Sequence, residues 1–146
     1  MAAIVRFEEQ YRDDTIFCLL LAKDALGRRP RLNEDLLDIQ GHYFSHGDMF
    51  WIALDESDRV VGMVGTKTVS PTDMWLKRLY VKPALKKTGI GSALLATAER
   101  YAAEKGITTI HTRFSDDYVE AACFYPKKGF IERERNEDSR HLIKRI

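Results

Sequence analysis

A basic, glycine-rich turn near the middle of the chain constrains the fold more than any other feature of the sequence. Residues 76–81 form a β-type run before it, and the Ala-, Leu- and Glu-rich residues 93–105 follow it and end at Gly106. The turn between them reads Lys-Lys-Thr-Gly-Ile-Gly-Ser over residues 86–92. This order predicts a strand, a tight turn and a helix, because glycine adopts the backbone conformations that such a turn requires.

The start of this helix suits an anion. Backbone N–H groups from Thr88 to Ser92 have no acceptor within the helix, and the positive end of the helix dipole faces the same way. Lys86 and Lys87 add positive charge, which favours a pyrophosphate over a single phosphate. The turn is neither a Walker A loop, which Gly-Lys-Ser/Thr would close, nor a dinucleotide fingerprint, because Leu94 stands where a third glycine belongs. A purely structural turn is the alternative.

A second motif follows some thirty residues later, with the sequence Ala-Ala-Cys-Phe-Tyr-Pro-Lys-Lys-Gly-Phe over residues 121–130. Together, the two segments resemble the GNAT superfamily of acetyl-CoA-dependent N-acetyltransferases. The turn fits that family's pyrophosphate loop, Gln/Arg-x-x-Gly-x-Gly/Ala, with Lys86 in the first position. The second segment fits Asn-x-x-Ala-x-x-hydrophobic-Tyr-x-x-x-Gly-Phe, with Tyr118 where the asparagine is common. The resemblance covers residues 74–132 well.

The resemblance implies that acetyl-CoA is the cosubstrate, and we expect no metal because the sequence has no clustered His or Cys spacing. In this family the strand before the loop is bulged, and its unpaired backbone groups hold the pantetheine arm and the thioester oxygen. The residues expected to bind acetyl-CoA are therefore Leu79, Tyr80 and Val81 from the strand and Lys86, Lys87, Thr88, Gly89, Ile90, Gly91 and Ser92 from the turn and the helix start.

The resemblance also implies a catalytic role for Tyr125, whose family counterpart can protonate the thiolate as it leaves. A phenol with a pKa of about 10 is protonated at neutral pH, as a general acid must be. The alternative is an aromatic residue at a helix end that packs on the core beside Phe124.

The general base is not assigned by the sequence. Many relatives carry a glutamate early in the fourth strand, where this chain has Trp75, a residue that either narrows an acceptor pocket or fills the sheet face. The aromatic residues 42–51 adjoin a region that shapes the acceptor site in the family, although Phe50 and Trp51 are better explained as core. An ordered water is as good a candidate for the base as any of the polar side chains, which are Asp73, His42, His46, Asp48 and His111.

Composition and spacing predict one α/β domain with a mixed sheet over residues 1–146. The resemblance implies that this is a GNAT-like domain, with a mixed twisted β-sheet flanked by about four helices. With 45% apolar and 31% charged residues, the chain is typical of a globular domain. Strands are expected at residues 4–7, 49–54, 60–69, 74–81, 107–114, 130–135 and 141–146. Helices are expected at residues 15–22, at 33–41 with Asn33 as the cap, at 93–105 and at 118–125.

Charge and cysteine content limit the compartment and the partners. The net charge is +1, so no global field attracts nucleic acid or a membrane. The longest apolar run, residues 16–22, is too short to span a bilayer, and the first residues do not resemble a signal peptide. Cys18 and Cys123 suggest neither a disulfide framework nor a metal site, and Cys123 is expected to be a small core residue. We expect a cytoplasmic protein.

The sequence as a whole therefore predicts an N-acetyltransferase. A primary amine acceptor would attack the thioester of acetyl-CoA directly in a ternary complex, and the protein would be a monomer or a homodimer. The alternative is a non-catalytic CoA- or acyl-CoA-binding module of the same fold. A nucleotide-binding regulatory domain is disfavoured, because the Walker and dinucleotide patterns are missing.

Overall fold

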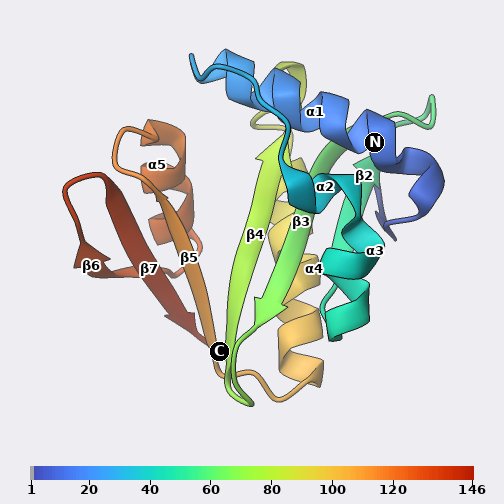
Figure 1. Ribbon diagram of the computed structural model, residues 1–146. Helices are drawn as coiled ribbons and strands as arrows, with labels where there is room; N and C mark the ends of the chain where they lie inside the picture. Colours follow the sequence, from blue (N-terminus) through green and yellow to red (C-terminus); the bar gives the residue numbers. More distant parts are fainter. Residues whose placement is uncertain (1) are drawn as a thin grey trace. The chain divides into compact units, whose positions relative to one another are not determined.

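The order of strands and helices along the chain follows the order predicted from the sequence. The computed structural model describes residues 2–146, and Figure 1 follows them from β1 to β7. The strands are β1 (Ala3–Arg6), β2 (Phe50–Leu54), β3 (Val60–Thr68), β4 (Asp73–Val81), β5 (Thr109–Ser115), β6 (Ile131–Arg135) and β7 (Ser139–Arg145). The α-helices are α1 (Arg12–Ala25), α2 (Glu34–Leu37), α3 (Ile39–His42), α4 (Ile90–Glu104) and α5 (Val119–Lys127), with short 3₁₀ turns at Glu9–Tyr11, Phe44–His46 and Pro83–Leu85.

The strands form a mixed sheet in the order β1-β2-β3-β4-β5-β7-β6. The β1–β2, β2–β3, β5–β7 and β6–β7 pairs are antiparallel, whereas β4 and β5 are parallel. The parallel ladder joins Asp73–Trp75 to Thr109–His111. A mixed sheet in an α/β chain confirms the predicted fold class.

The chain forms two compact units. One runs up to Lys67 and includes Lys77–Ala98, and the other consists of Thr68–Leu76 and Glu99–Ile146. The sequence prediction of one domain over residues 1–146 stays a prediction.

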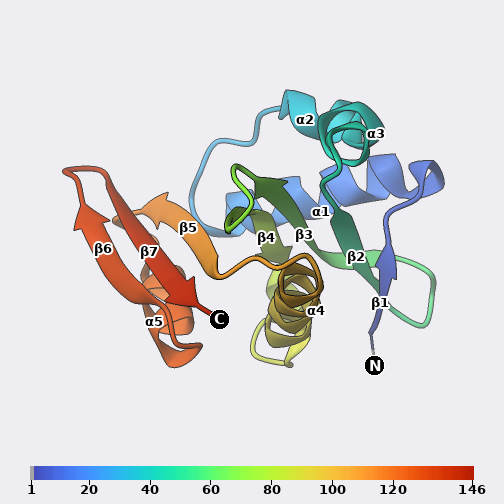
Figure 2. The same ribbon diagram turned by 90° about the horizontal axis from the view of Figure 1, so that it is seen from below.

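In the first unit, helices cover both faces of the strands. Met63 of β3 belongs to a buried cluster with Leu19 of α1 and Leu36 of α2. The neighbouring residue, Gly62, faces the start of α4 instead, as alternation along a strand requires. Figure 2 shows α1–α3 on one side of these strands, and the part of α4 that belongs to this unit covers the opposite side.

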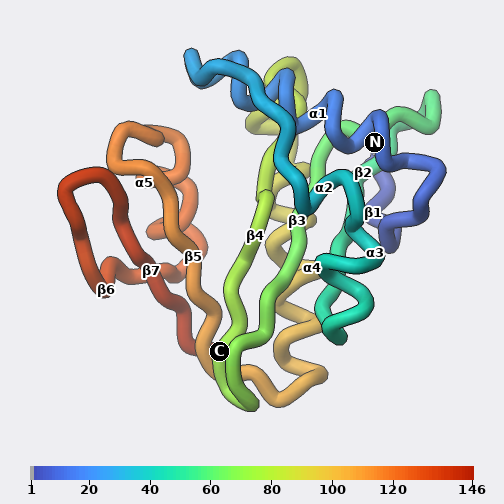
Figure 3. The backbone as a smooth tube through the Cα atoms, in the orientation of Figure 1, coloured from blue at the N-terminus to red at the C-terminus, as the bar shows by residue number. Residues whose placement is uncertain are grey.

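In the second unit, α5 packs on a sheet made of β5, β7 and β6. β5 pairs with β7 over its full length, from Thr109↔Arg145 to Ser115↔Ser139, and β6 adds the outer strand. Figure 3 traces β6 and β7 as the last hairpin of the chain, with β7 next to β5. α5 contacts this sheet through Tyr125, whose ring stacks on Phe114 at 5.7 Å between centroids.

Two helices differ from the sequence prediction. The expected helix over residues 33–41 is divided at Asp38, whose backbone is not helical (φ −143°, ψ 71°) and whose side chain accepts from the Gly41 N–H at the start of α3. Asn33 makes no capping hydrogen bond, because its side-chain amide donates to the Arg31 carbonyl instead. These two short helices raise the number of α-helices to five in the described residues, against the four expected.

Helix α5 also continues past Pro126 to Lys127, whereas the sequence predicted an end at Tyr125. Proline removes one N–H donor but fits a last helical turn, and here Lys128 N–H donates to the Tyr125 carbonyl to close that turn. Gly129 (φ +93°) then reverses the chain toward β6.

Candidate active site

The turn between β4 and α4 has the geometry that the glycine-rich motif predicts. Two residues within it have left-handed backbones, Lys87 (φ +65°) and Gly89 (φ +91°), and α4 begins at the next residue, Ile90. The left-handed conformation is strained for lysine and easy for glycine, so the glycine at 89 is a conformational requirement of the turn.

The first turn of α4 presents backbone donors that the protein does not satisfy. The first α-helical hydrogen bond at this end runs from Ala93 N–H to the Gly89 carbonyl at 3.0 Å. Within residues 2–146, no backbone N–H from Lys87 to Ser92 donates to a backbone carbonyl. Gly91 has no side chain to cover this end of the helix, and Lys86 and Lys87 lie just before it. Such an end binds anions, because donors and helix dipole act together.

A glycine in the neighbouring strand lets this helix start lie close to the sheet. A Cβ atom on Gly62 of β3 would come within 3.0 Å of Leu94 Cδ1, 3.1 Å of Ile90 Cγ2 and 3.2 Å of the Tyr80 carbonyl oxygen. The bare backbone of Gly62 therefore fixes how the first turn of α4 sits against β3 and β4. No sequence pattern near Gly62 predicted this role.

Strand β4 carries the irregularity that the family resemblance implied. Arg78 has a left-handed backbone (φ +57°) inside the strand, immediately before the predicted pantetheine-binding residues 79–81. A non-glycine residue in this conformation within a strand is strained and persists only where its surroundings hold it. The expected acetyl-CoA-binding residues of β4, of the turn and of the first turn of α4 all lie in the first unit.

Asp35 of α2 holds Arg78 in place. The guanidinium donates to both carboxylate oxygens, from Nε to Oδ2 at 3.0 Å and from Nη2 to Oδ1 at 2.8 Å. The Tyr43 hydroxyl donates to the same Oδ2 at 2.7 Å. Burial by itself would raise the pKa of Asp35, but the hydrogen bonds from Arg78 and Tyr43 outweigh it and lower this pKa below its ordinary value. Asp35 is therefore a charged anchor for the irregular part of β4.

Tyr125, the predicted general acid, lies in the second unit. Its side chain is buried, with 7% of its surface exposed, and contacts the rings of Phe114, Phe124 and Phe130. This aromatic setting fixes the ring, and the catalytic role of the hydroxyl stays a prediction.

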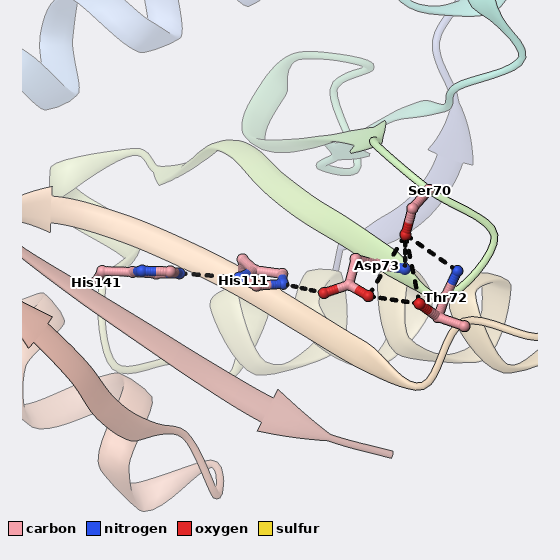
Figure 4. A network of polar contacts seen from close by, with 5 residues as sticks. All are labelled: Ser70, Thr72, Asp73, His111 and His141. Carbon is pink, nitrogen blue, oxygen red and sulfur yellow. Dashed lines mark hydrogen bonds and ion pairs between the residues drawn. The ribbon is translucent and has the colours of Figure 1, made fainter.

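Two of the base candidates contact each other, together with a histidine that the sequence analysis missed. Asp73 Oδ2 lies 2.6 Å from His111 Nε2, and His111 Nδ1 lies 2.9 Å from His141 Nε2 (Figure 4). Trp75 stacks on both imidazoles, with centroid distances of 4.9 Å to His111 and 4.8 Å to His141. Trp75 therefore lies on the sheet face, as one of the two sequence interpretations held, and it packs there against two histidines that the sequence did not bring together.

The other three candidates for the general base lie outside this cluster. His42 and His46 are exposed and Asp48 is buried, and all three belong to the first unit.

Two further predictions concern burial. Phe50 and Trp51 are buried in β2, which confirms their interpretation as core. The prediction for Cys123 is wrong: its thiol side chain is exposed, because it lies on the outer side of α5 while Tyr125 faces the sheet.

Neither a membrane span nor a metal site emerges from the described residues. No helix within 2–146 has the length and apolar character needed to cross a membrane. In the same residues, no three His, Cys, Asp or Glu side chains are grouped so as to hold a metal ion.

Comparison with known proteins identifies the family. Residues 46–132 match the family model described as "Acetyltransferase (GNAT) domain". Human N-acetyltransferase 8 is 31% identical, over 66% of this chain and 44% of the relative, and the probable N-acetyltransferase camello of Xenopus laevis is 33% identical, over 66% and 45%. The chain belongs to the GNAT family of acetyltransferases, as the two motifs predicted. It spans less than half the length of these curated relatives.

Solved structures agree on the fold. An acetyltransferase of the GNAT family from Staphylococcus aureus Mu50 superposes with a TM-score of 0.91 at 23% identity, over 99% of each chain. The PaiA N-acetyltransferase from Thermoplasma acidophilum, in complex with coenzyme A, superposes with a TM-score of 0.83 at 20% identity, over 100% of this chain and 99% of that one. At these identities the likeness shows the fold alone.

Replacing Asp35 with alanine should destabilise the first unit. The change leaves the half-buried Arg78 guanidinium and the Tyr43 hydroxyl without their acceptor, so we expect a loss of about 1–3 kcal/mol in the free energy of unfolding. The control is Asp116→Ala, which also removes a carboxylate that accepts from two arginines, Arg135 and Arg140, but at a more exposed site. For Asp116→Ala we expect a loss of about 0–1 kcal/mol in the free energy of unfolding.

Urea denaturation of both variants at neutral pH measures the difference. Because the pKa of Asp35 is lowered in the folded state, its contribution is present above its ordinary pKa and disappears as the pH falls through the lowered value. Equal losses in the two variants would contradict the anchoring role of Asp35.

Proposed function

We propose that this chain is an acetyl-CoA-dependent N-acetyltransferase whose acceptor is a primary amine. The observation that carries the proposal is the open row of N–H groups from Lys87 to Ser92 at the start of α4, in a chain that belongs to the GNAT family. The proposed partners are acetyl-CoA and an amine-bearing acceptor, in a cytoplasmic monomer or homodimer.

The proposed binding of acetyl-CoA uses residues of β4 and of the following turn. The N–H groups of Thr88–Ser92 would face the pyrophosphate, and Lys86 and Lys87 would add positive charge. The backbone groups of residues 79–81, next to the irregularity at Arg78, would hold the pantetheine arm and place one N–H at the thioester oxygen. A preorganised donor to a developing oxyanion contributes about 3–4 kcal/mol to transition-state stabilisation.

The proposed chemistry is direct attack by the neutral amine on the thioester carbon in a ternary complex. A new C–N bond forms, the C–S bond breaks, and the electron pair of that bond goes to sulfur. Tyr125 would donate its hydroxyl proton to the thiolate, because a phenol is protonated at neutral pH. The buried ring, held by Phe114, Phe124 and Phe130, would keep the hydroxyl in a fixed position.

A non-catalytic module that binds CoA or acyl-CoA is the second candidate. The observation in its favour is Trp75, which stands where many family members carry a glutamate. Such a module would bind acetyl-CoA through the same turn and would not turn it over.

Thiol release distinguishes the two candidates. The chain is incubated with acetyl-CoA and a panel of primary amines, and free CoA thiol is measured with and without each amine. We expect release that depends on at least one amine, at a rate proportional to protein concentration. Tight acetyl-CoA binding without amine-dependent release from any acceptor would support the binding module and contradict the enzyme.

The Gly91→Val variant tests the anion site. A β-branched side chain in the first turn of α4 should block close approach of phosphates to the backbone, so we expect acetyl-CoA affinity to fall by at least tenfold in isothermal titration. Ala96→Val is the matched control, because residue 96 is exposed one turn further along the same helix. A folded Gly91→Val variant with parental affinity would show that the pyrophosphate does not bind here.

The Tyr125→Phe variant tests the proton donor. Phenylalanine preserves the ring contacts with Phe114 and Phe130, so we expect little change in acetyl-CoA affinity and a fall in kcat at the low end of the usual 10²–10⁴-fold range. Steady-state kinetics with the best acceptor gives kcat, and titration gives the affinity. A kcat within twofold of the parent would leave Tyr125 with a packing role only.

A further inference from the structure

Asp73, His111 and His141 form one continuous hydrogen-bonded chain across three strands of the second unit. Asp73 begins β4, His111 lies in the middle of β5, and His141 lies in β7. The two histidines are 6% and 7% exposed. A buried pair of histidines that ends on a carboxylate is an arrangement used to move or hold a proton.

The carboxylate end of this chain is fixed by its own turn. Asp73 Oδ1 accepts from the Thr72 hydroxyl at 2.6 Å, and Asp73 N–H donates to Ser70 Oγ at 3.0 Å (Figure 4). The hydrogen bonds from Thr72 and His111 lower the pKa of Asp73 below its ordinary value. Asp73 is therefore a carboxylate at neutral pH and can only accept hydrogen bonds.

An ionised Asp73 dictates the position of every proton in the chain. His111 must donate from Nε2 to Asp73, so the Nδ1 of neutral His111 carries a lone pair. That lone pair must accept from Nε2–H of His141. A neutral His141 is thereby left with its basic lone pair on Nδ1, the nitrogen that faces away from His111.

This last nitrogen is the end of the hydrogen-bonded chain. Nδ1 of His141 makes no hydrogen bond to residues 2–146, whereas its Nε2 contacts His111. His141 as a whole is 7% exposed. The end of the chain away from Asp73 is thus a base and not a donor.

The surroundings keep His141 neutral. Burial lowers its pKa below the ordinary value, and the charges of Arg113 on β5 and Arg133 on β6, together with His111, lower it further, against a smaller opposing effect of Glu134. Trp75 covers one side of both imidazoles, with interplanar angles of 21° and 18°. An indole face also stabilises a cation that forms beneath it.

We propose that His141, through Nδ1, is the general base for the acceptor amine, and that His111 and Asp73 are positioning residues that hold its tautomer. This proposal rests on the proposed N-acetyltransferase function. It assigns the base to a histidine that stacks on Trp75, the residue that stands where many relatives carry a glutamate.

The proton transfer balances with the acetyl transfer. As the C–N bond forms, the amine nitrogen loses one proton to His141 Nδ1, and His141 becomes an imidazolium. Its Nε2–H stays donated to His111, whose Nε2–H stays donated to Asp73, so the carboxylate stabilises the new charge through two hydrogen bonds. The imidazolium then releases its proton to solvent, and the Tyr125 phenolate left by proton donation to the thiolate takes one up from solvent. This completes the reaction of amine and thioester to amide and thiol.

Histidine tautomers provide the direct test. In long-range ¹H–¹⁵N spectra of the ¹⁵N-labelled protein near pH 7.5, we expect both His111 and His141 to carry their proton on Nε2. In Asp73→Asn, the amide oxygen should stay with the Thr72 hydroxyl and the NH₂ should donate to His111 Nε2. His111 and His141 should then both move their proton to Nδ1. The matched control is Asp138→Asn, an exposed change of the same kind in the β6–β7 turn, which should leave both tautomers unchanged.

Kinetics tests the role in the reaction. His141→Gln keeps a donor to His111 and removes the basic nitrogen, so we expect kcat to fall by about 100-fold with acetyl-CoA affinity within twofold of the parent. Protonation of the acceptor amine lowers kcat/KM toward acid in every variant. In the parent we expect a further acidic limb with an apparent pKa below 6.5, and this further limb should be absent in His141→Gln. Asp73→Asn should lower kcat as well. In this variant the proton of His141 lies on Nδ1, so that nitrogen is a donor and cannot accept the proton of the amine.

The outcomes separate the two proposals. A parent that binds acetyl-CoA but releases no thiol with any amine contradicts the proposed function. An active parent whose kcat and acidic limb survive in both His141→Gln and Asp73→Asn contradicts the relay and leaves the function standing. A proton on Nδ1 of His141 in the parent spectrum also overturns the relay.

Discussion

The candidate site depends on a row of backbone donors that the protein leaves unsatisfied at the start of α4. Left-handed backbones at Lys87 and Gly89 turn the chain so that the helix begins with its N–H groups open, and the bare backbone of Gly62 lets this helix start lie against β3. In the same unit, Asp35 holds the strained Arg78 in β4. The strained backbones of Lys87 and Arg78 are thus stabilised by packing and ion pairing with other parts of the same unit.

The second unit separates the two proposed proton-transfer groups by strand alternation. Phe114 and Arg113 are neighbours in β5, so their side chains point to opposite faces. Tyr125 packs on the face of Phe114, whereas His111 shares the face of Arg113 with Trp75. The proposed proton donor and the proposed proton acceptor therefore lie on opposite faces of β5.

The parts of this account that sequence could predict are the local ones. The turn at Gly89 follows from residues next to one another, and so do the strand before it and the helix after it. By contrast, the conformation of Arg78 depends on Asp35, which lies 43 residues away, and the contact between His111 and His141 depends on the register of β5 against β7. Asn33 failed as a cap for a local reason, because its side-chain amide donates to the Arg31 carbonyl and makes no hydrogen bond to the start of α2.

The most direct test of the account is to observe the open N–H groups while acetyl-CoA binds. A titration of the ¹⁵N-labelled chain, followed by two-dimensional amide spectra, reports every backbone donor separately. The account predicts that the amides of Gly89, Ile90, Gly91 and Ser92 shift most and saturate together at one equivalent. Saturable binding that leaves these four amides unmoved would contradict it.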